Sequence, residues 1–562
     1  MDRNTLIALA LFAALFFGWE KYLDWKYPNR HEPAASAATE QPSEAESPKG
    51  EIPQGSSAPI SLGAPEAVTS GMPEQVITLE RPLYTASFSS HGGALRSWML
   101  ATYDDASQPG RPPVSITTSS SELSLTTPLR ELGHGDLSTL PYAVTQPSKD
   151  TVEFTAQVGA VRIRKTYRLE SDGYGARLSV EIENGGGTAL RPDYRVRWPA
   201  QLADGADFVE YGLAAYAADK QVHIAIAPLP SMLGFGGGPA TETMQVQPEP
   251  GDAYELDWAG AQTRYFLAAV LPDTPRDARA ELNPVEPGRK GQLDVWFEPV
   301  DLPPGAKLSR DYRLYLGPKE ADRLDAFGAH LDESIQRGWV PILARWFTAM
   351  LTFLHEFVPN YGVSILILTF LIRVALAPLM VGQMRSMKKM ADLAPRMKDI
   401  QERHKNDPQK QQEAMLAMYR ETGVNPLSSL GGCLPLLLQM PVFVGFYSAL
   451  QGSIQLRQQP FVAWITDLAR PETLFVIPGI DLPVRALPLA LGAAMVLQQR
   501  LTPTPASMDP MQQRMLQVVM PVMMTFMFYQ FASGLGLYWL MSTLLGIGQQ
   551  MWMNRGRTPA AA

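Results

Sequence analysis

The sequence has few of the residues that enzymes use for nucleophilic or metal chemistry. Its 562 residues include one cysteine, Cys433, in an apolar run, so the chain cannot form an internal disulfide and the thiol is interpreted as a small core residue. None of the seven histidines lies inside a predicted transmembrane span, and no cluster has metal-ligand spacing. At Ser533, Phe531 occupies the place of the first glycine of a nucleophile elbow. We therefore expect no enzymatic activity, no cofactor and no metal.

Charge is also unevenly spread. The net charge of -8 and the isoelectric point near 5.6 give no reason to expect recognition of a specific nucleic-acid sequence. The first 340 residues are those of an ordinary polar protein, whereas 19 of the 25 methionines lie after residue 379, most of them in segments almost free of charge. This composition predicts a polar part followed by a part embedded in a membrane.

The N-terminus is predicted to be a transmembrane anchor at residues 5–24. A cleaved signal peptide is the alternative, but the small-residue site at Ala35–Ala37 lies far beyond the charged residues that end the apolar run. Trp19, Tyr22 and Trp25 are typical of an interfacial aromatic belt. We expect an uncleaved anchor with a cytoplasmic N-terminus.

A flexible tether and a β domain follow the anchor. Residues 25–74 are rich in Pro, Ala, Ser and Glu without hydrophobic periodicity, which predicts a tether. Residues 75–318 form short runs punctuated by Gly and Pro, which predict a large antiparallel sandwich. The clearest alternation, in residues 161–169 and 178–183, predicts a hairpin with one buried face and cross-strand pairs of Arg and Glu on the other.

Residues 319–360 are predicted to be a helical connector that ends in an interfacial amphipathic helix. Apolar residues recur at spacings of three and four from Leu324 to Ile335. The following apolar stretch contains two tryptophans and Arg345, which suit a helix lying in the membrane interface better than one that spans the membrane.

The rest of the chain is predicted to cross the membrane five more times. Residues 515–554 carry no charge and, at about 60 Å as a single helix, would be twice the ~30 Å hydrocarbon thickness. We expect two spans there, with the turn at Ala532–Gly534. The predicted transmembrane segments after the anchor are residues 361–382, 429–454, 483–502, 511–532 and 534–554.

The loops determine the predicted orientation. The loop at residues 383–428 carries nine Lys or Arg, whereas the loop at 455–482 carries two, so the positive-inside rule makes the first cytosolic and the second periplasmic. The span at 483–502 is the weakest, since its short charge-free window also suits a re-entrant segment. Only a full crossing also leaves the tail at 555–562 in the cytosol.

Arg373 is the only charged residue between Glu356 and Arg385. A charge at that depth costs about 2.5–3.5 kcal/mol on insertion scales, so such an arginine usually faces a polar cavity or pathway. The alternative is a snorkelling arginine or one paired with an acidic helix neighbour. No Asp or Glu occurs inside any apolar segment, which favours the cavity.

Several motifs together resemble the YidC family of membrane protein insertases, in its Gram-negative form. The resemblance covers nearly the whole chain. Its motifs are Asn360-Tyr361-Gly362 with Leu371-Ile372-Arg373, Val424-Asn425-Pro426-Leu427, Gly431-Gly432-Cys433-Leu434-Pro435, Gln439-Met440-Pro441-Val442-Phe443, Asp509-Pro510-Met511-Gln512-Gln513, Ser533-Gly534-Leu535, His330-Leu331-Asp332 with Gly338-Trp339, and Gln262 with Tyr265-Phe266.

The resemblance implies an exported all-β supersandwich domain, an interfacial helix, five core spans and a cytosolic helical hairpin. With the predicted anchor, the expected fold is a polytopic α-helical membrane protein with six transmembrane helices. The resemblance also implies a hydrophilic groove, open to cytoplasm and lipid, with Arg373 in its wall. Gln530-Phe531-Ala532 departs from the Trp-Phe-Pro that the family often has before Ser-Gly. The resemblance therefore does not indicate which residues line the groove there.

The expected substrate-binding residues fall into two groups. Polar side chains on the spans would line the groove with Arg373, and apolar ones would guide the hydrophobic part of a client; ordinary interhelical hydrogen bonds and bundle packing are the alternatives. The residues are Arg373, Thr369, Gln439, Met440, Phe443, Tyr538 and Trp539, with Thr525, Gln530, Ser542 and Thr543 as further polar candidates.

The resulting hypothesis is an insertase of the bacterial inner membrane that passes short hydrophilic tails of nascent membrane proteins across it and releases their hydrophobic segments into lipid. The resemblance implies the Sec translocon and SecDF as partners, and the ribosome at the cytosolic hairpin, which is otherwise a solvated element that sets topology. An anion transporter or channel is the alternative function, because it would also use an intramembrane arginine. We find neither an internal repeat nor matching broken helices.

Overall fold

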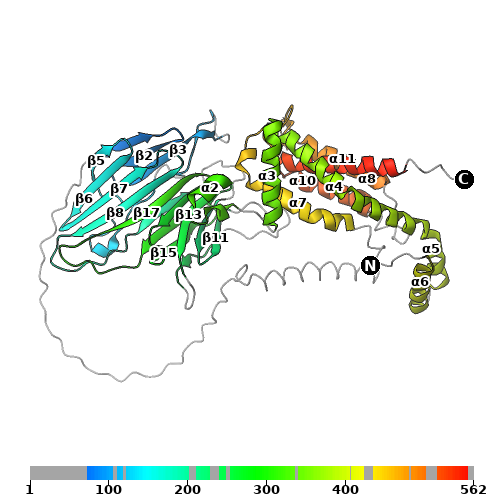
Figure 1. Ribbon diagram of the computed structural model, residues 1–562, viewed down its shortest axis with the longest axis horizontal. Coiled ribbons are helices and arrows are strands. Elements are labelled where there is room, and N and C mark those ends of the chain that lie inside the picture. The colour runs from blue at the N-terminus through cyan, green and yellow to red at the C-terminus, as the bar shows by residue number, and fades with distance from the viewer. Residues whose placement is uncertain are drawn as a thin grey trace, which may run out of the picture. The chain divides into compact units, whose positions relative to one another are not determined.

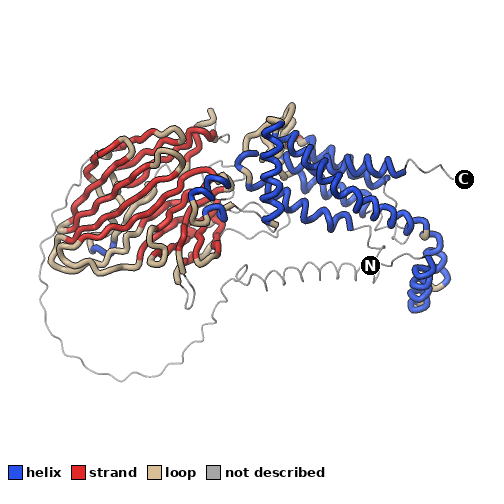
Figure 2. Tube along the Cα trace, in the orientation of Figure 1, coloured by secondary structure: helices blue, strands red, loops and turns tan. Residues whose placement is uncertain are grey.

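The computed structural model describes residues 73–105, 110–117, 122–201, 211–227, 240–248, 254–335, 340–405, 407–422, 434–479, 482–501 and 515–554. The predicted anchor at 5–24, most of the tether at 25–74, Cys433 and the tail at 555–562 lie outside these residues. Strands dominate up to Pro318 and helices follow (Figure 2).

Three antiparallel sheets form the β domain (Figure 1). A four-stranded sheet has the order β1-β2-β3-β4, a nine-stranded sheet has the order β11-β10-β13-β14-β17-β8-β7-β6-β5, and a second four-stranded sheet has the order β12-β15-β16-β9. The strands are β1 (Val76–Glu80), β2 (Tyr84–Ser89), β3 (Ala94–Asp104), β4 (Pro113–Ser115), β5 (Ala143–Ser148), β6 (Thr151–Val158), β7 (Val161–Leu169), β8 (Gly175–Asn184), β9 (Val196–Gln201), β10 (Tyr211–Ala217), β11 (Lys220–Ala227), β12 (Met244–Val246), β13 (Leu256–Thr263), β14 (Phe266–Pro272), β15 (Ala278–Glu286), β16 (Lys290–Phe297) and β17 (Lys307–Pro318). A short helix η1 (Arg130–Leu132) precedes β5.

The predicted hairpin is confirmed as β7 and β8. The two strands pair antiparallel with Arg162 opposite Glu183 and Arg164 opposite Glu181. Both pairs form ion pairs, at 3.2 and 3.1 Å. The alternation of apolar and charged residues thus fixes the register, because a slip by one residue would turn the apolar face to water.

Lys165 breaks this alternation, since it lies on the buried face of β7 and is fully buried. Its Nζ donates to the carbonyl oxygens of Gly92 and Leu125, at 3.0 and 2.7 Å, and Tyr167 donates to Gly93 O at 2.9 Å. The buried ammonium therefore connects the nine-stranded sheet to the loop after β2 and to the chain before η1. Nothing in the apolar pattern of the sequence predicts this role.

The connector at residues 319–360 is divided into several helices, whereas the sequence predicted a continuous helical pattern. It comprises α2 (Ala321–Phe327), the short helix η2 (Leu331–Ser334) and α3 (Pro341–Phe357). The expectation of one helical pattern from Leu324 to Ile335 is wrong, because Gly328, Ala329 and His330 have φ values of 81°, 53° and 53°. This left-handed region ends a helix. Leu324 and Leu331 are nevertheless both buried in the core of the β domain.

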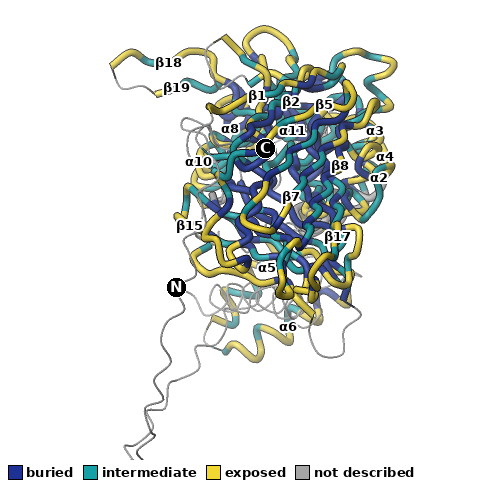
Figure 3. The backbone as a smooth tube through the Cα atoms, turned by 90° about the vertical axis from the view of Figure 1, so that its left-hand side faces the viewer, coloured by how far each residue is buried: buried dark blue, intermediate teal, exposed yellow. Residues whose placement is uncertain are grey.

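The helices that follow are α4 (Tyr361–Asp392), α5 (Ala394–Arg403), α6 (Pro408–Thr422), α7 (Leu434–Gly452), α8 (Ala486–Leu501), the π-helix η5 (Met515–Val519), α10 (Met520–Phe528) and α11 (Ser533–Asn554). Between α7 and α8 lie the short helix η4 (Ile454–Leu456) and the hairpin of β18 (Phe475–Ile477) and β19 (Leu482–Val484), which is largely exposed (Figure 3).

Two local expectations for these helices change. The break predicted near Asp407 separates α5 from α6, but the first helix of the expected pair is divided, because α4 continues to Asp392 before α5 begins. The predicted turn at Ala532–Gly534 lies earlier, at residues 529–532, and Gly534 is inside α11.

Gly534 and Gly362 serve close packing. A Cβ at Gly534 would lie 3.1 Å from the carbonyl oxygen of Leu468, and one at Gly362 would lie 2.2 Å from the ring of Phe461. Asn360 Nδ2 donates to Phe461 O at 3.0 Å, and Asn360 Oδ1 accepts from the Val363 N–H at 3.1 Å. The motif around Tyr361 thus caps α4 and holds it against the loop after η4.

Within the described residues, no helix is by itself long and apolar enough to cross a membrane, whereas the pair Pro341–Phe357 and Tyr361–Ala377, bent by 120°, is so by length and composition. The prediction of six transmembrane helices is therefore not confirmed. Large apolar side chains are exposed along the helices, among them Phe370, Val374, Val522, Met523 and Phe526.

Lys165→Met tests the buried ammonium, because methionine keeps an unbranched stem without an ionisable group. Burial lowers the pKa of Lys165 to about 7, whereas an unfolded lysine has a pKa of about 10.4. Between these values the unfolded state binds more protons, so the free energy of unfolding rises with pH by up to about 1.4 kcal/mol per unit. We expect calorimetry of the full chain from pH 7 to 10 to show this rise for the wild type only. Equal slopes for both proteins would contradict the assignment.

Candidate functional site

Polar groups lie on one face of α11. Tyr538, Ser542 and Gly546 are spaced by four residues and therefore share a face of the helix. All three are buried. This face is turned toward side chains from α4, α7 and α8, so residues from four helices meet along it.

Arg373 of α4 reaches this face. Its Nε donates to Ser542 Oγ at 2.9 Å. A Cβ at Gly546 would lie 3.8 and 3.9 Å from the two terminal guanidinium nitrogens and 3.0 Å from Nε2 of Gln498 of α8. The glycine thus leaves room on α11 for the guanidinium of Arg373 and the amide of Gln498.

Among the residues that the structure describes, no carboxylate forms an ion pair with Arg373. Its hydrogen-bond partner among these residues is the neutral hydroxyl of Ser542, which orients the guanidinium without neutralising it. The half-buried cation therefore keeps its charge available to an anionic group that approaches from outside the bundle.

Gln439 of α7 makes the second polar contact with α11. Its Nε2 donates to the hydroxyl of Tyr538, whose ring stacks on Phe446 with centroids 4.4 Å apart. The tyrosine is thus packed on one side and hydrogen-bonded at its end. Gln439 and Arg373 lie next to residues one helical turn apart on α11.

Aromatic side chains border these polar groups. The rings of Phe443 and Trp539 meet edge to face, with centroids 4.9 Å apart, and Phe528 of α10 lies 6.5 and 5.2 Å from them. Met440 precedes this cluster on α7 and is 42% exposed. Four of the expected apolar and polar residues, Gln439, Phe443, Tyr538 and Trp539, are therefore brought together between α7 and α11.

The expected threonines have other bonds. Thr369 is buried and donates to Ile365 O at 2.6 Å. Thr525 and Thr543 likewise donate to the carbonyl oxygens of Pro521 and Trp539, four residues earlier. Such bonds within one helix satisfy the hydroxyl proton and leave only the lone pairs of the oxygen for a ligand. Gln530 follows α10 and is exposed.

Sequence reasoning missed Gln498 and Gly546. The spacing of four residues from Ser542 to Gly546 was a signal for a small position on the face that carries Ser542. Gln498 has no such signal, because only the packing of α8 beside α11 brings it to the guanidinium.

The chain matches two family models and many curated relatives. The model described as "YidC periplasmic domain" matches residues 76–350, and the model described as "60Kd inner membrane protein" matches residues 353–560. A protein of Pelobacter propionicus named "Membrane protein insertase YidC" is 32% identical over 99% of each chain. One of Geobacter sulfurreducens with the same name is 32% identical over 100% of each chain.

A solved structure titled "Active YidC insertase crystal structure with the first transmembrane domain resolved" is also similar. It is 18% identical, covers 86% of this chain and 93% of its own, and has a TM-score of 0.33.

Ser542→Ala tests the bond that orients Arg373. The substitution removes the hydroxyl acceptor from a buried position, so we expect the free energy of unfolding to fall by about 1.5–3 kcal/mol, the range for hydrogen bonds to charged groups. Thr543→Val is the matched control, because it removes a neighbouring hydroxyl that bonds only its own helix. Thermal unfolding of the two variants in detergent measures the difference, and an equal loss of stability in both would count against the bond.

Proposed function

The chain belongs to the YidC family of membrane protein insertases, and on that basis we propose that it passes short hydrophilic tails of nascent membrane proteins across the bacterial inner membrane and releases their hydrophobic segments into lipid. Its fold is YidC-like, with a β-rich periplasmic domain. The observation that carries the proposed mechanism is Arg373, a cation among packed helices that is oriented by Ser542 and has no carboxylate partner in the described part of the chain.

A hydrophilic groove is the first element of the proposal. Tyr538, Ser542, Gln439 and Gln498 supply hydroxyl and amide groups around Arg373. Polar groups and water in such a groove lower the cost of moving a short tail across, because the tail exchanges one set of hydrogen bonds for another. The positive charge of Arg373 attracts acidic residues in the tail.

Release into lipid is the second element. The aromatic cluster of Phe443, Trp539 and Phe528 borders the polar groups, and Met440 is exposed beside it. Methionine and aromatic side chains adapt to varied apolar sequences. A hydrophobic client segment would slide along this surface while its polar tail occupies the groove. Thr369, also expected to bind the client, would contribute only the acceptor side of its hydroxyl.

The proposed topology has six crossings, with the anchor followed by α4, α7, α8, η5 with α10, and α11. Its support is the charge distribution, since nine basic residues in the loop at 383–428 contrast with two at 455–482. The N-terminus and the tail would be cytoplasmic and the β domain periplasmic. The exposed apolar side chains of α4 and α10 would then face lipid.

The helices α5 and α6 would project into the cytosol as a docking element. They pack on each other through Met397, Met418 and Tyr419, while Lys398, Arg403 and Lys410 are exposed. This charged outer surface suits a ribosome or an emerging client. The Sec translocon and SecDF are proposed as partners on the family resemblance alone.

An anion transporter or channel remains the second candidate, because the same uncompensated arginine would serve an anion path. Purified protein in liposomes separates the two functions. Insertion of a small membrane protein without anion flux is expected for an insertase, whereas anion flux without insertion would favour the transporter.

The charge of Arg373 is tested with clients that differ only in their exported tails. For Arg373→Ala we expect the insertion rate of a client with an acidic tail to fall about tenfold, equivalent to about 1.4 kcal/mol, and that of a client with an uncharged tail to fall less than about threefold. Arg373→Lys keeps the charge and should stay within about twofold of the wild type.

Arg500→Ala, at the exposed end of α8, is the matched control for loss of a basic residue and should leave both clients unaffected. Equal loss for acidic and uncharged tails in Arg373→Ala would refute charge attraction.

The β domain is proposed to be mainly a scaffold. We expect deletion of most of residues 75–310 to leave insertion working, provided that α3 is kept. Leu324 and Leu331 pack into the β-domain core, so a second variant lacking residues 75–335 removes the apolar surface that the first exposes. An insertion assay at matched membrane levels decides the question, and loss of activity in both variants would contradict the scaffold role.

A further inference from the structure

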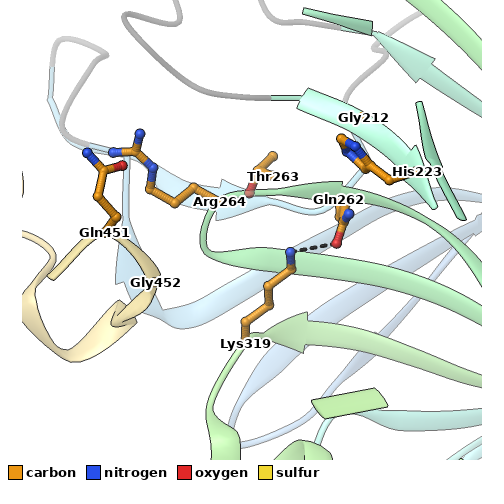
Figure 4. Close-up of a pocket in the computed structure, with 8 residues that line it drawn as sticks. All are labelled: Gly212, His223, Gln262, Thr263, Arg264, Lys319, Gln451 and Gly452. Atoms are coloured by element: carbon orange, nitrogen blue, oxygen red, sulfur yellow. Dashed lines mark hydrogen bonds between the residues drawn. The ribbon is translucent and has the colours of Figure 1, made fainter. Parts of the chain in front are cut away.

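A small cavity lies where β10, β11, β13 and the end of β17 meet the C-terminal end of α7 (Figure 4). Its volume is about 50 Å³, enough for three to five water molecules at about 10–15 Å³ each, or for one phosphate group. Eight residues line it: Gly212, His223, Gln262, Thr263, Arg264, Lys319, Gln451 and Gly452. None of these eight is acidic.

The amide of Gln262 has a fixed orientation. Lys319 Nζ donates to Gln262 Oε1 at 2.6 Å and to Ser334 O at 3.0 Å. Because an ammonium group can only donate, the oxygen of the amide has to face it, and the NH₂ group faces the other way. Both side chains are at least 95% buried, since Gln262 is 3% and Lys319 4% exposed.

The NH₂ group of Gln262 has no hydrogen-bond partner in the described part of the chain. In Figure 4 it points toward Gly212 and His223. Gly212 is the register partner of Gln262 on β10, and a Cβ there would lie 2.4 Å from Nε2 of His223. The absence of a side chain at Gly212 thus keeps the space beside the amide open. A buried donor left without an acceptor usually costs about 1–3 kcal/mol, so its presence calls for a ligand or water.

Arg264 adds a permanent positive charge. Thr263 Oγ1 accepts from the backbone N–H groups of Tyr265 and Phe266, at 3.3 and 3.0 Å, and so shapes the turn that carries Arg264 between β13 and β14. The turn holds the arginine at the cavity wall, where its guanidinium lies toward Gln451 in Figure 4. Hydrogen-bond donors beside positive charge suit a phosphate oxygen.

We propose that this cavity binds a phosphate group, with Gln262 Nε2 donating to one of its oxygens and with Arg264 and Lys319 supplying positive charge at the cavity wall. A phospholipid headgroup and free inorganic phosphate share this chemistry. The assignment is independent of the insertion mechanism, because it uses none of the residues around Arg373.

The test uses the full chain and two probes. Calorimetric titration with inorganic phosphate in lipid-free detergent detects the free ion, and native mass spectrometry of protein from nanodiscs of phosphatidylglycerol counts retained lipids. Gln262→Glu keeps an acceptor for Lys319 but replaces the donor by a negative charge, so binding should be lost. Arg264→Gln should weaken it about tenfold. Arg162→Gln, on the exposed face of β7, is the matched control and should bind as the wild type does.

If the two cavity variants bind inorganic phosphate more weakly than the wild type, the ligand is the free ion. If those variants retain one lipid fewer per chain, the ligand is the headgroup. Thermal melting verifies that each variant is folded. Binding of neither probe by the wild type, or equal binding by folded variants and wild type, would overturn the proposal.

Discussion

The arrangement of the helices depends on one uncompensated cation. Arg373 carries a charge that cannot be left among packed helices without partners, and the described residues offer it a hydroxyl rather than a carboxylate. Ser542 has to be small and polar, and Gly546 has to lack a side chain, for the guanidinium to lie against α11. The packing of α4, α8 and α11 is therefore constrained by the space and hydrogen bonds that this one side chain requires.

Buried cations in the β domain are also held by hydrogen bonds to neutral oxygen atoms. Lys165 is held by the carbonyl oxygens of Gly92 and Leu125, and Lys319 donates to the amide oxygen of Gln262 and the carbonyl of Ser334. A neutral oxygen fixes the position of a cation without supplying a negative charge. At Lys165 the consequence is a pKa lowered by burial. At Arg373 the same arrangement supports the proposed attraction for an acidic tail.

Sequence patterns predicted what depends on neighbours along the chain. The alternation in β7 and β8 yielded the hairpin and its ion pairs, and the apolar context of Arg373 identified the residue on which the site is centred. Sequence patterns failed where contacts between distant parts of the chain determine the local structure. The left-handed residues after α2, the burial of Lys165, and the approach of Gln498 to Arg373 arise from packing between distant segments. Thr369 shares a helical face with Arg373, yet its hydroxyl bonds its own helix.

The central claim is that a client passes between Arg373 and the aromatic cluster on α7 and α11. Site-specific photo-crosslinking tests it most directly, with a photoreactive residue at position 373, 439 or 443 and a ribosome-stalled nascent membrane protein. The account predicts that positions 373 and 439 crosslink to the hydrophilic tail and position 443 to the hydrophobic segment. Crosslinks absent from all three positions, while sites on the far side of the bundle react with the client, would contradict it.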